Sequence, residues 1–217
     1  MDEAAVKAQV FSHIRQAGGR RKPILTAELT LGTSGTRADV AVLADAELIG
    51  LEIKTERDSL RRLPSQLEAY ARYFDHVIIV AASCHFAELA ETDLHGASVW
   101  RSTRDGLSPV INGQPNSILP RAYLDLMTRQ EKKGFLTKGA TTVREHYFDI
   151  FTSRYGESSR TFWQSVAGRK IKADDVPLLS RFNGRRIATE LVAREREQRW
   201  QRWQDAYAGL NGLASPA

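Results

Sequence analysis

Along the first 82 residues, the spacing of the apolar residues alternates between that of a helix and that of a strand. The order of these segments limits the folds that the chain can adopt. Val6, Val10 and Ile14 lie four apart and predict an amphipathic helix over residues 3–17. β-rich segments then predict strands at 24–31, 37–43 and 48–54, followed by a helix within 58–74 and a buried strand at 76–82. Helix, three strands, helix and strand together predict a three-layer α/β fold around a mixed sheet.

The helix between the third and fourth strands has one apolar face. Its large apolar residues recur at spacings of three and four, at Leu60, Leu63, Leu67, Tyr70 and Phe74. Asp58-Ser59 is a candidate N-cap. Because Pro64 lies inside this pattern, the helix begins either at the cap or near Pro64, with residues 60–63 as a preceding turn.

The second part of the chain has a different composition. Residues 106–120 are rich in Pro, Gly, Asn and Ser and predict a linker. Helical patterns follow at about 121–136, 142–155, 159–170 and 184–208. We therefore expect three parts, which are a core over 1–105, a linker over 106–120 and a basic helical domain over 121–217 that binds nucleic acid or mediates dimerisation.

Charge is distributed unevenly along the 217 residues. Residues 1–118 hold 13 Lys and Arg against 15 Asp and Glu, for a net charge of −2, whereas residues 119–217 hold 18 against 11, for a net charge of +7. The basic second half favours a polyanion partner. An Arg-rich helical surface exposed to solvent explains the charge equally well.

The cysteine content and the N-terminus exclude several classes of protein. A single cysteine, Cys84, excludes an internal disulfide, a cysteine zinc site and an iron–sulfur cluster. The longest apolar run, residues 77–82, is far shorter than the ~20 residues of a membrane-spanning helix. The acidic start Met1-Asp2-Glu3 is unlike a signal peptide. We expect a cytoplasmic protein with no membrane partner.

Two carboxylates oppose each other in the expected hairpin of the second and third strands. If the hairpin is centred on Asp45 and Ala46, the numbers of paired residues sum to 91, and Asp39 lies directly across from Glu52. Opposed residues have Cβ atoms about 4.5–5.5 Å apart, and like charges so close destabilise a sheet unless a cation lies between them. Carboxylate oxygens favour a hard cation, so the pair predicts a Mg²⁺ or Mn²⁺ site.

A lysine and a further acidic residue accompany this pair. Lys54 follows Glu52 at i, i+2, on the same strand face and about 6.5–7 Å along it, where its charge can orient a water or stabilise a phosphoryl oxygen. Glu28 interrupts the first strand and is a candidate further ligand or water-holding base. The triplet Glu52-Ile53-Lys54 alone is weak evidence for a metal site, because a solvent-facing ion pair of Glu52 with Lys54 explains it as well.

The series Glu28, Asp39 and Glu52-Ile53-Lys54, on this order of elements, resembles the PD-(D/E)XK nuclease superfamily. Ala38 replaces the proline of the family's name. Gln66-Leu67-Glu68-Ala69-Tyr70 is similar to the Q-x-x-x-Y motif of the RecB-like and lambda-exonuclease-like branch, which includes small stand-alone bacterial or phage members.

The resemblance implies a restriction-endonuclease-like core and a Mg²⁺-dependent deoxyribonuclease, a hydrolase of DNA phosphodiester bonds. The implied metal ligands are Asp39, Glu52, the backbone carbonyl of Ile53, and Glu28. Lys54 assists the attacking water, while Gln66 and Tyr70 complete the catalytic site. For Tyr70 a purely structural role in the core is the alternative, because it also belongs to the apolar stripe.

Clusters of basic residues are the candidates for contact with DNA. They are Arg37, Arg57, Arg61, Arg62, Arg169, Lys170, Arg185 and Arg186. Trp200 and Trp203 share a helix face and favour packing within the chain or in a homodimer over base stacking. The functional alternative to a nuclease is a nucleic-acid-binding or partner-binding protein that keeps the fold without turnover.

Overall fold

The computed structural model describes residues 1–18, 22–137, 142–180, 195–201 and 203. The chain forms two compact units, Met1–Arg181 and Phe182–Ala217. In the second unit the described residues are helical, and the exposed rings of Trp200 and Trp203 stack with centroids 5.1 Å apart. Most of the helix expected at 184–208, together with Arg185 and Arg186, lies outside the described residues.

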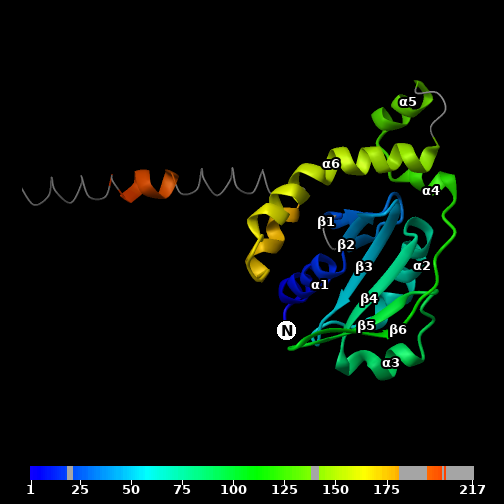
Figure 1. The fold of residues 1–217 in the computed structure, drawn as a ribbon, viewed down its shortest axis with the longest axis horizontal. Helices are drawn as coiled ribbons and strands as arrows, with labels where there is room; N and C mark the ends of the chain where they lie inside the picture. The colour runs from blue at the N-terminus through cyan, green and yellow to red at the C-terminus, as the bar shows by residue number, and fades with distance from the viewer. Residues whose placement is uncertain (19–21, 138–141, 181–194, 202, 204–217) are drawn as a thin grey trace, which may run out of the picture. The chain divides into compact units, whose positions relative to one another are not determined.

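A six-stranded mixed sheet forms the centre of the first unit (Figure 1). Its strands lie in the order of the sequence, as β1 (Ile24–Thr30), β2 (Arg37–Ala44), β3 (Glu47–Lys54), β4 (His76–Ala82), β5 (Ser98–Thr103) and β6 (Gly106–Ile111). β1, β2 and β3 pair antiparallel, β3, β4 and β5 pair parallel, and β6 returns antiparallel to β5. The protein is therefore an α/β protein with a mixed sheet, as expected.

The hairpin of β2 and β3 has the expected register. Val40 pairs with Leu51 and Ala44 pairs with Glu47, so the numbers of paired residues sum to 91. Asp45 and Ala46 form the turn, and both have positive φ values, of 48° and 60°. This combination is typical of the two-residue turns whose twist matches a β-hairpin.

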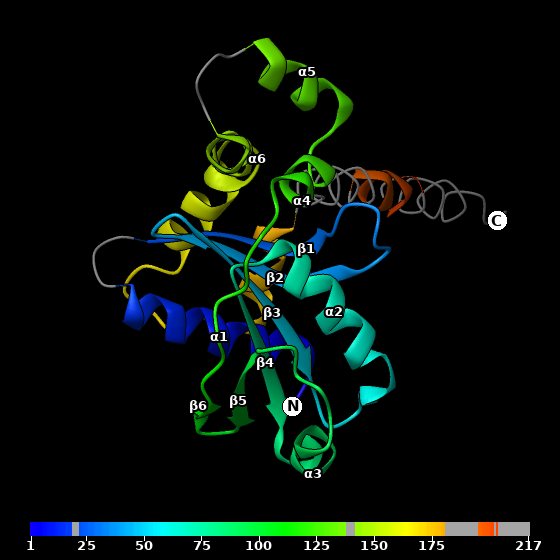
Figure 2. The ribbon, with the colours of Figure 1, turned by 90° about the vertical axis from the view of Figure 1, so that its right-hand side faces the viewer.

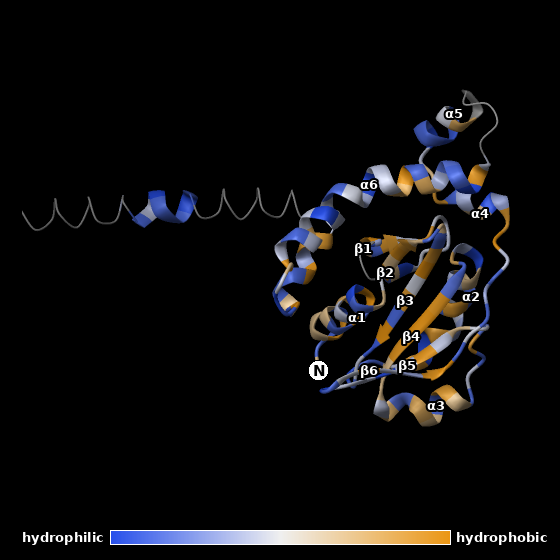
Figure 3. Ribbon diagram, in the orientation of Figure 1, coloured by the Kyte–Doolittle hydropathy of each residue, from blue (hydrophilic) through white to orange (hydrophobic). Residues whose placement is uncertain are grey.

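Apolar side chains cover both faces of the sheet. The helix α1 (Glu3–Ala17) packs Val6, Val10 and Phe11 against one face, in a cluster with Val40 and Ile53. The helix α2 (Leu63–Tyr73) packs against the other face. Figure 2 shows α1 and α2 on opposite sides of the sheet, and Figure 3 shows the hydrophobic residues concentrated on the strands between them.

The beginning of α2 agrees with the second of the two alternatives for Pro64. A 3₁₀ turn, η1 (Leu60–Arg62), comes first, and α2 starts at Leu63 with Pro64 in its first turn. Ser59 caps η1 by accepting a hydrogen bond from the backbone N–H of Arg61 at 3.2 Å. The predicted apolar stripe from Leu60 to Phe74 is fully buried.

The rest of the first unit is mainly helical. Its elements are η2 (Ser83–His85), α3 (Phe86–Ala90), α4 (Pro120–Asp125), α5 (Arg129–Thr137), α6 (Val143–Ser165) and η3 (Ala173–Leu179). The helices expected at 142–155 and 159–170 form one helix, α6, which begins with a capping box of Thr142 and Glu145. Among the described residues, no helix is long and apolar enough to span a membrane.

The expected division at residues 105 and 120 differs from the structure. Residues 106–111, expected as linker, form the edge strand β6, where Pro109 is tolerated because an edge strand leaves some backbone donors unpaired. Tyr123, Tyr147 and Phe151 from α4 and α6 lie in one cluster with core residues of the sheet. The compact unit therefore continues to residue 181, because these helices bury their aromatic faces on the sheet.

Candidate functional site

Asp39 and Glu52 lie one step beyond the pair Val40–Leu51, at the positions that the register of the hairpin makes opposed. Glu52 is 2% exposed, and Asp39 is partly buried. Asp39 Oδ2 accepts a hydrogen bond of 2.8 Å from the backbone N–H of Ile53, which joins the two strands beside the carboxylates. The two acidic groups thus share one partly enclosed place where the pairing of β2 with β3 ends.

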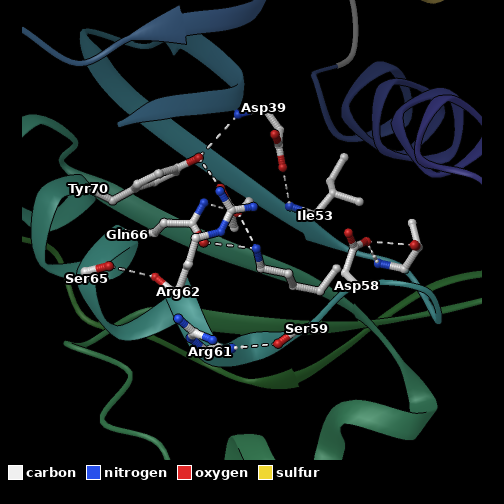
Figure 4. A network of polar contacts seen from close by, with 12 residues as sticks. Asp39, Ile53, Asp58, Ser59, Arg61, Arg62, Ser65, Gln66 and Tyr70 are labelled. Carbon is white, nitrogen blue, oxygen red and sulfur yellow. Dashed lines mark hydrogen bonds and ion pairs between the residues drawn. The ribbon is translucent and has the colours of Figure 1, made fainter. Parts of the chain in front are cut away.

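Three side chains donate hydrogen bonds to the carboxylate of Glu52. Lys54 Nζ and Gln66 Nε2 each lie 2.7 Å from Oε1, and the hydroxyl of Tyr70 lies 2.5 Å from Oε2. Lys54 Nζ also donates to Gln66 Oε1 at 3.0 Å. Gln66 and Tyr70 reach the strand together because residues four apart share one face of α2 (Figure 4).

The hydroxyl of Tyr70 links both carboxylate-bearing strands. It accepts a hydrogen bond of 3.2 Å from the backbone N–H of Asp39, as Figure 4 shows, and it donates one to Glu52. Its ring packs in the core, with its centroid 5.2 Å from that of Phe74. The pKa of Tyr70 is raised well above its ordinary value, because burial and the two nearby carboxylates oppose the phenolate. Tyr70 therefore belongs to both the core and the site.

The charge of the cluster is incompletely balanced. Burial, and next the Glu52 carboxylate, raise the pKa of Asp39 to about 7, although the Ile53 N–H and the charge of Lys7 act in the opposite direction. Lys54 forms its ion pair with Glu52. Lys7 is buried on α1 and pairs with Glu3 at 2.6 Å. When both carboxylates are ionised, the single lysine paired beside them leaves an excess of negative charge.

The oxygens that remain suit a hard cation. Within the described chain, Asp39 Oδ1 accepts no hydrogen bond, and Glu52 Oε2 accepts one, from Tyr70. A carboxylate oxygen has two lone pairs, so both groups keep acceptor capacity for a metal ion. Together with the excess negative charge, this donor set fits Mg²⁺ or Mn²⁺ held by two carboxylates and several waters.

Glu28 does not join this cluster. Its position on β1, between the pairs Ala27–Val40 and Leu29–Ala38, is opposite Asp39, but its φ is +62°, in the left-handed region. Its carboxylate is exposed and lies 3.7 Å from Arg37. No group of three His, Cys, Asp or Glu side chains that could hold a metal is found among the described residues. The left-handed backbone at Glu28 departs from the extended strand on which the expectation of a third ligand rested.

The turn after Lys54 is held by contacts that the sequence did not reveal. Asp58 Oδ2 accepts hydrogen bonds from the backbone N–H of Thr55 at 2.8 Å and from its hydroxyl at 2.7 Å. His85 Nε2 lies 2.7 Å from the carbonyl of Thr55. Asp58 therefore fixes this turn instead of capping the helix. Lys7 was also missed, although its place on the apolar stripe between Val6 and Val10 was a signal.

The expected basic residues have different environments. Arg57, Arg61 and Arg62 are exposed on the segment between β3 and α2, and Figure 4 shows Arg62 near Gln66 and Arg61 beside Ser59. Arg37 is exposed beside Glu28. Lys170 is exposed, whereas Arg169 forms a two-point ion pair with Asp175, at 2.7 and 2.8 Å. Arg169 thus has a structural partner.

The fold and this cluster place the chain in a class of α/β proteins that carry paired carboxylates and a lysine on neighbouring strands of a mixed sheet. The family model described as bacteriophage P4 protein cII matches residues 1–180. The chain belongs to this family.

A relative called protein cII, from Enterobacteria phage P4, is 25% identical in an alignment 211 residues long, and the match covers 84% of this chain and 79% of that protein. A solved structure of a protein of unknown function from Silicibacter pomeroyi is similar with a TM-score of 0.43 and 16% identity, over 70% of this chain and 91% of that one.

Proposed function

We propose that the protein is a metal-dependent nuclease that hydrolyses phosphodiester bonds of DNA. The observation that carries the proposal is the carboxylate of Glu52, which receives hydrogen bonds from Lys54, Gln66 and Tyr70 directly beside Asp39. This arrangement supports the resemblance to the PD-(D/E)XK superfamily, because it joins the residues of two separate motifs, on a strand pair and on a helix, in one network.

Asp39 and Glu52 would hold the metal ion, with the Ile53 carbonyl as a further ligand. When bound, Mg²⁺ or Mn²⁺ supplies a Lewis acid that polarises the phosphoryl oxygen and lowers the pKa of a bound water. Glu28 is left out of this ligand set, because its carboxylate is exposed and no group of three such side chains is found among the described residues.

Lys54 has a donor available for the reaction. An ammonium group has three N–H donors, and in the structure two of them are directed to Glu52 and Gln66. The third can hold the attacking water or an oxygen of the phosphate, where its charge stabilises the transition state. Gln66 keeps the lysine in place, since it accepts from Lys54 and donates to the same Glu52 oxygen.

Cleavage assays test the proposal. The purified protein is incubated with linear, nicked, branched and single-stranded DNA in Mg²⁺ or Mn²⁺, and the products are resolved on gels. We expect cleavage of at least one substrate and a loss of about 100-fold or more in Glu52→Gln and Lys54→Met. Asp93→Asn, at an exposed carboxylate on the turn after α3, is the matched control and keeps full activity.

Metal titration separates the nuclease from a binding protein without turnover. Calorimetry should give Mn²⁺ heats in the wild type that Asp39→Asn abolishes and Asp93→Asn retains. A wild type that gives no such heats and cleaves none of the substrates contradicts the proposal and favours the binding protein.

A further inference from the structure

A second place of interest lies on the α1 side of the sheet. An open hollow of about 660 Å³ is lined by α1, by the turn between β5 and β6, and by the segment that leads into η3. Three cations from two of these elements line it, namely Arg104, Lys170 and Lys172. We call it the basic hollow.

The walls of the basic hollow are fixed by hydrogen bonds. Gln9 on α1 donates to the carbonyl of Thr103 at 2.8 Å, which holds the β5–β6 turn against the helix. Arg15, also on α1, donates to the carbonyl of Arg169 at 2.8 Å. The ion pair of Arg169 with Asp175 then links the two ends of the segment that carries Lys170 and Lys172. The role of Arg169 is therefore to build the wall that presents Lys170.

The charge of the basic hollow is positive. Asp105 is the acidic residue among those that line it, against three cations. Within the described chain, none of Arg104, Lys170 and Lys172 forms an ion pair within 4.0 Å. Gln16, an exposed amide on α1, adds a neutral donor and acceptor on the same wall. Cations with amides between them are the groups that position a phosphodiester backbone.

The basic hollow lies next to the end of the strand that carries the candidate site. Met1 lines the hollow, and its amino group pairs with Glu56 at 2.5 Å. Glu56 is two residues after Lys54, the last residue of β3. The N-terminus therefore ties the hollow to the segment that leaves β3, two residues beyond the end of the strand that carries the candidate site.

We propose that the basic hollow binds the phosphodiester backbone of a nucleic acid strand, as a subsite beside the proposed catalytic centre. The inference rests on the proposed function for the identity of the polymer. The volume lies within the ~300–1,000 Å³ of pockets that hold one small organic ligand, so the hollow can take a nucleotide unit of the strand. The three cations contact its phosphates, and Asp105 limits the affinity.

Fluorescence anisotropy without divalent metal tests this subsite independently of cleavage. The probe is a labelled 20-nucleotide single strand, titrated with protein at several salt concentrations in EDTA. For Arg104→Ala/Lys170→Ala/Lys172→Ala we expect at least about tenfold weaker binding, and a salt slope that is smaller by about 2, since each phosphate contact on a single strand contributes about 0.7. Asp105→Asn should bind about threefold more tightly, because it removes the opposing charge.

A matched control removes the same charge elsewhere. Arg129, Lys133 and Arg160 are exposed on α5 and α6, and their triple alanine variant should keep most of the affinity. Equal weakening in both triple variants, an unchanged slope in the first, or no binding by the wild type overturns the inference. A failure of this inference can be distinguished from a failure of the proposed function. DNA binding that depends on the three cations of the hollow, without cleavage by any preparation, contradicts only the proposed function.

Discussion

Tyr70→Phe removes one oxygen and leaves the core ring in place. In the wild type this hydroxyl donates to Glu52 at 2.5 Å and accepts from the backbone N–H of Asp39 at 3.2 Å. A hydrogen bond to a charged group contributes about 1.5–3 kcal/mol, and a buried N–H left without a partner costs about 1–3 kcal/mol. Because the two effects overlap at one site, we expect a loss of about 2–4 kcal/mol in the free energy of unfolding.

The measurement is thermal and urea unfolding followed by circular dichroism, without divalent metal. For a domain of this size the expected loss lowers the melting temperature by about 5–10 °C. Tyr147→Phe is the control, because Tyr147 is also fully buried, but its hydroxyl has no hydrogen-bond partner among the described residues. Removing that hydroxyl should leave stability unchanged or slightly higher.

The comparison of the two variants decides the matter. If Tyr70→Phe and Tyr147→Phe melt within about 1 °C of each other, the Tyr70 hydroxyl does not hold the two strands, and the network around Glu52 is not a rigid site.

Two further predictions concern strain and pH. Glu28→Gly should be more stable to urea than Glu28→Ala by about 1 kcal/mol, because the φ of +62° is unstrained for glycine and both variants lose the contact with Arg37; equal stabilities would refute the strain. Although burial opposes ionisation, the Arg154 guanidinium and Thr128 hold the pKa of Glu131 at about 2, against 4.5 in the unfolded chain. The stabilisation by Glu131 is therefore full above pH 4.5 and is lost as the pH falls to about 2. In urea unfolding, the stability difference between the wild type and Glu131→Gln should shrink over that pH range. A difference that stays constant with pH would contradict this prediction.

The order of elements from α1 to β4 and the register of β2 with β3 were predictable from local pattern. Alternation of side chains places Glu52 and Lys54 on one face, and a two-residue turn at Asp45 and Ala46 places Asp39 opposite Glu52. The helix face that carries Gln66 and Tyr70 follows from the spacing of four.

Other features could not be predicted, because they depend on contacts between distant segments. Residues 106–111 have the composition of a linker, and only the free edge of β5 makes them a strand. Lys170 has the same sequence environment as Arg169, yet only Arg169 is bound to a nearby aspartate. Composition cannot distinguish a basic side chain that faces solvent from one whose ion pair fixes a segment of the chain.

The sequence by itself determined on which faces of strand and helix the candidate residues lie, through the periods of two and four, whereas their selection as one site came from the resemblance of their motifs. The tertiary structure decided how they meet. The docking of α2 on β3 directs the Tyr70 hydroxyl to β2 and β3. Glu28, whose own backbone is left-handed, does not join the two carboxylates. Side-chain direction along one element is a local property, whereas the distance between two elements and the backbone strain at their junction depend on the packing of the whole chain.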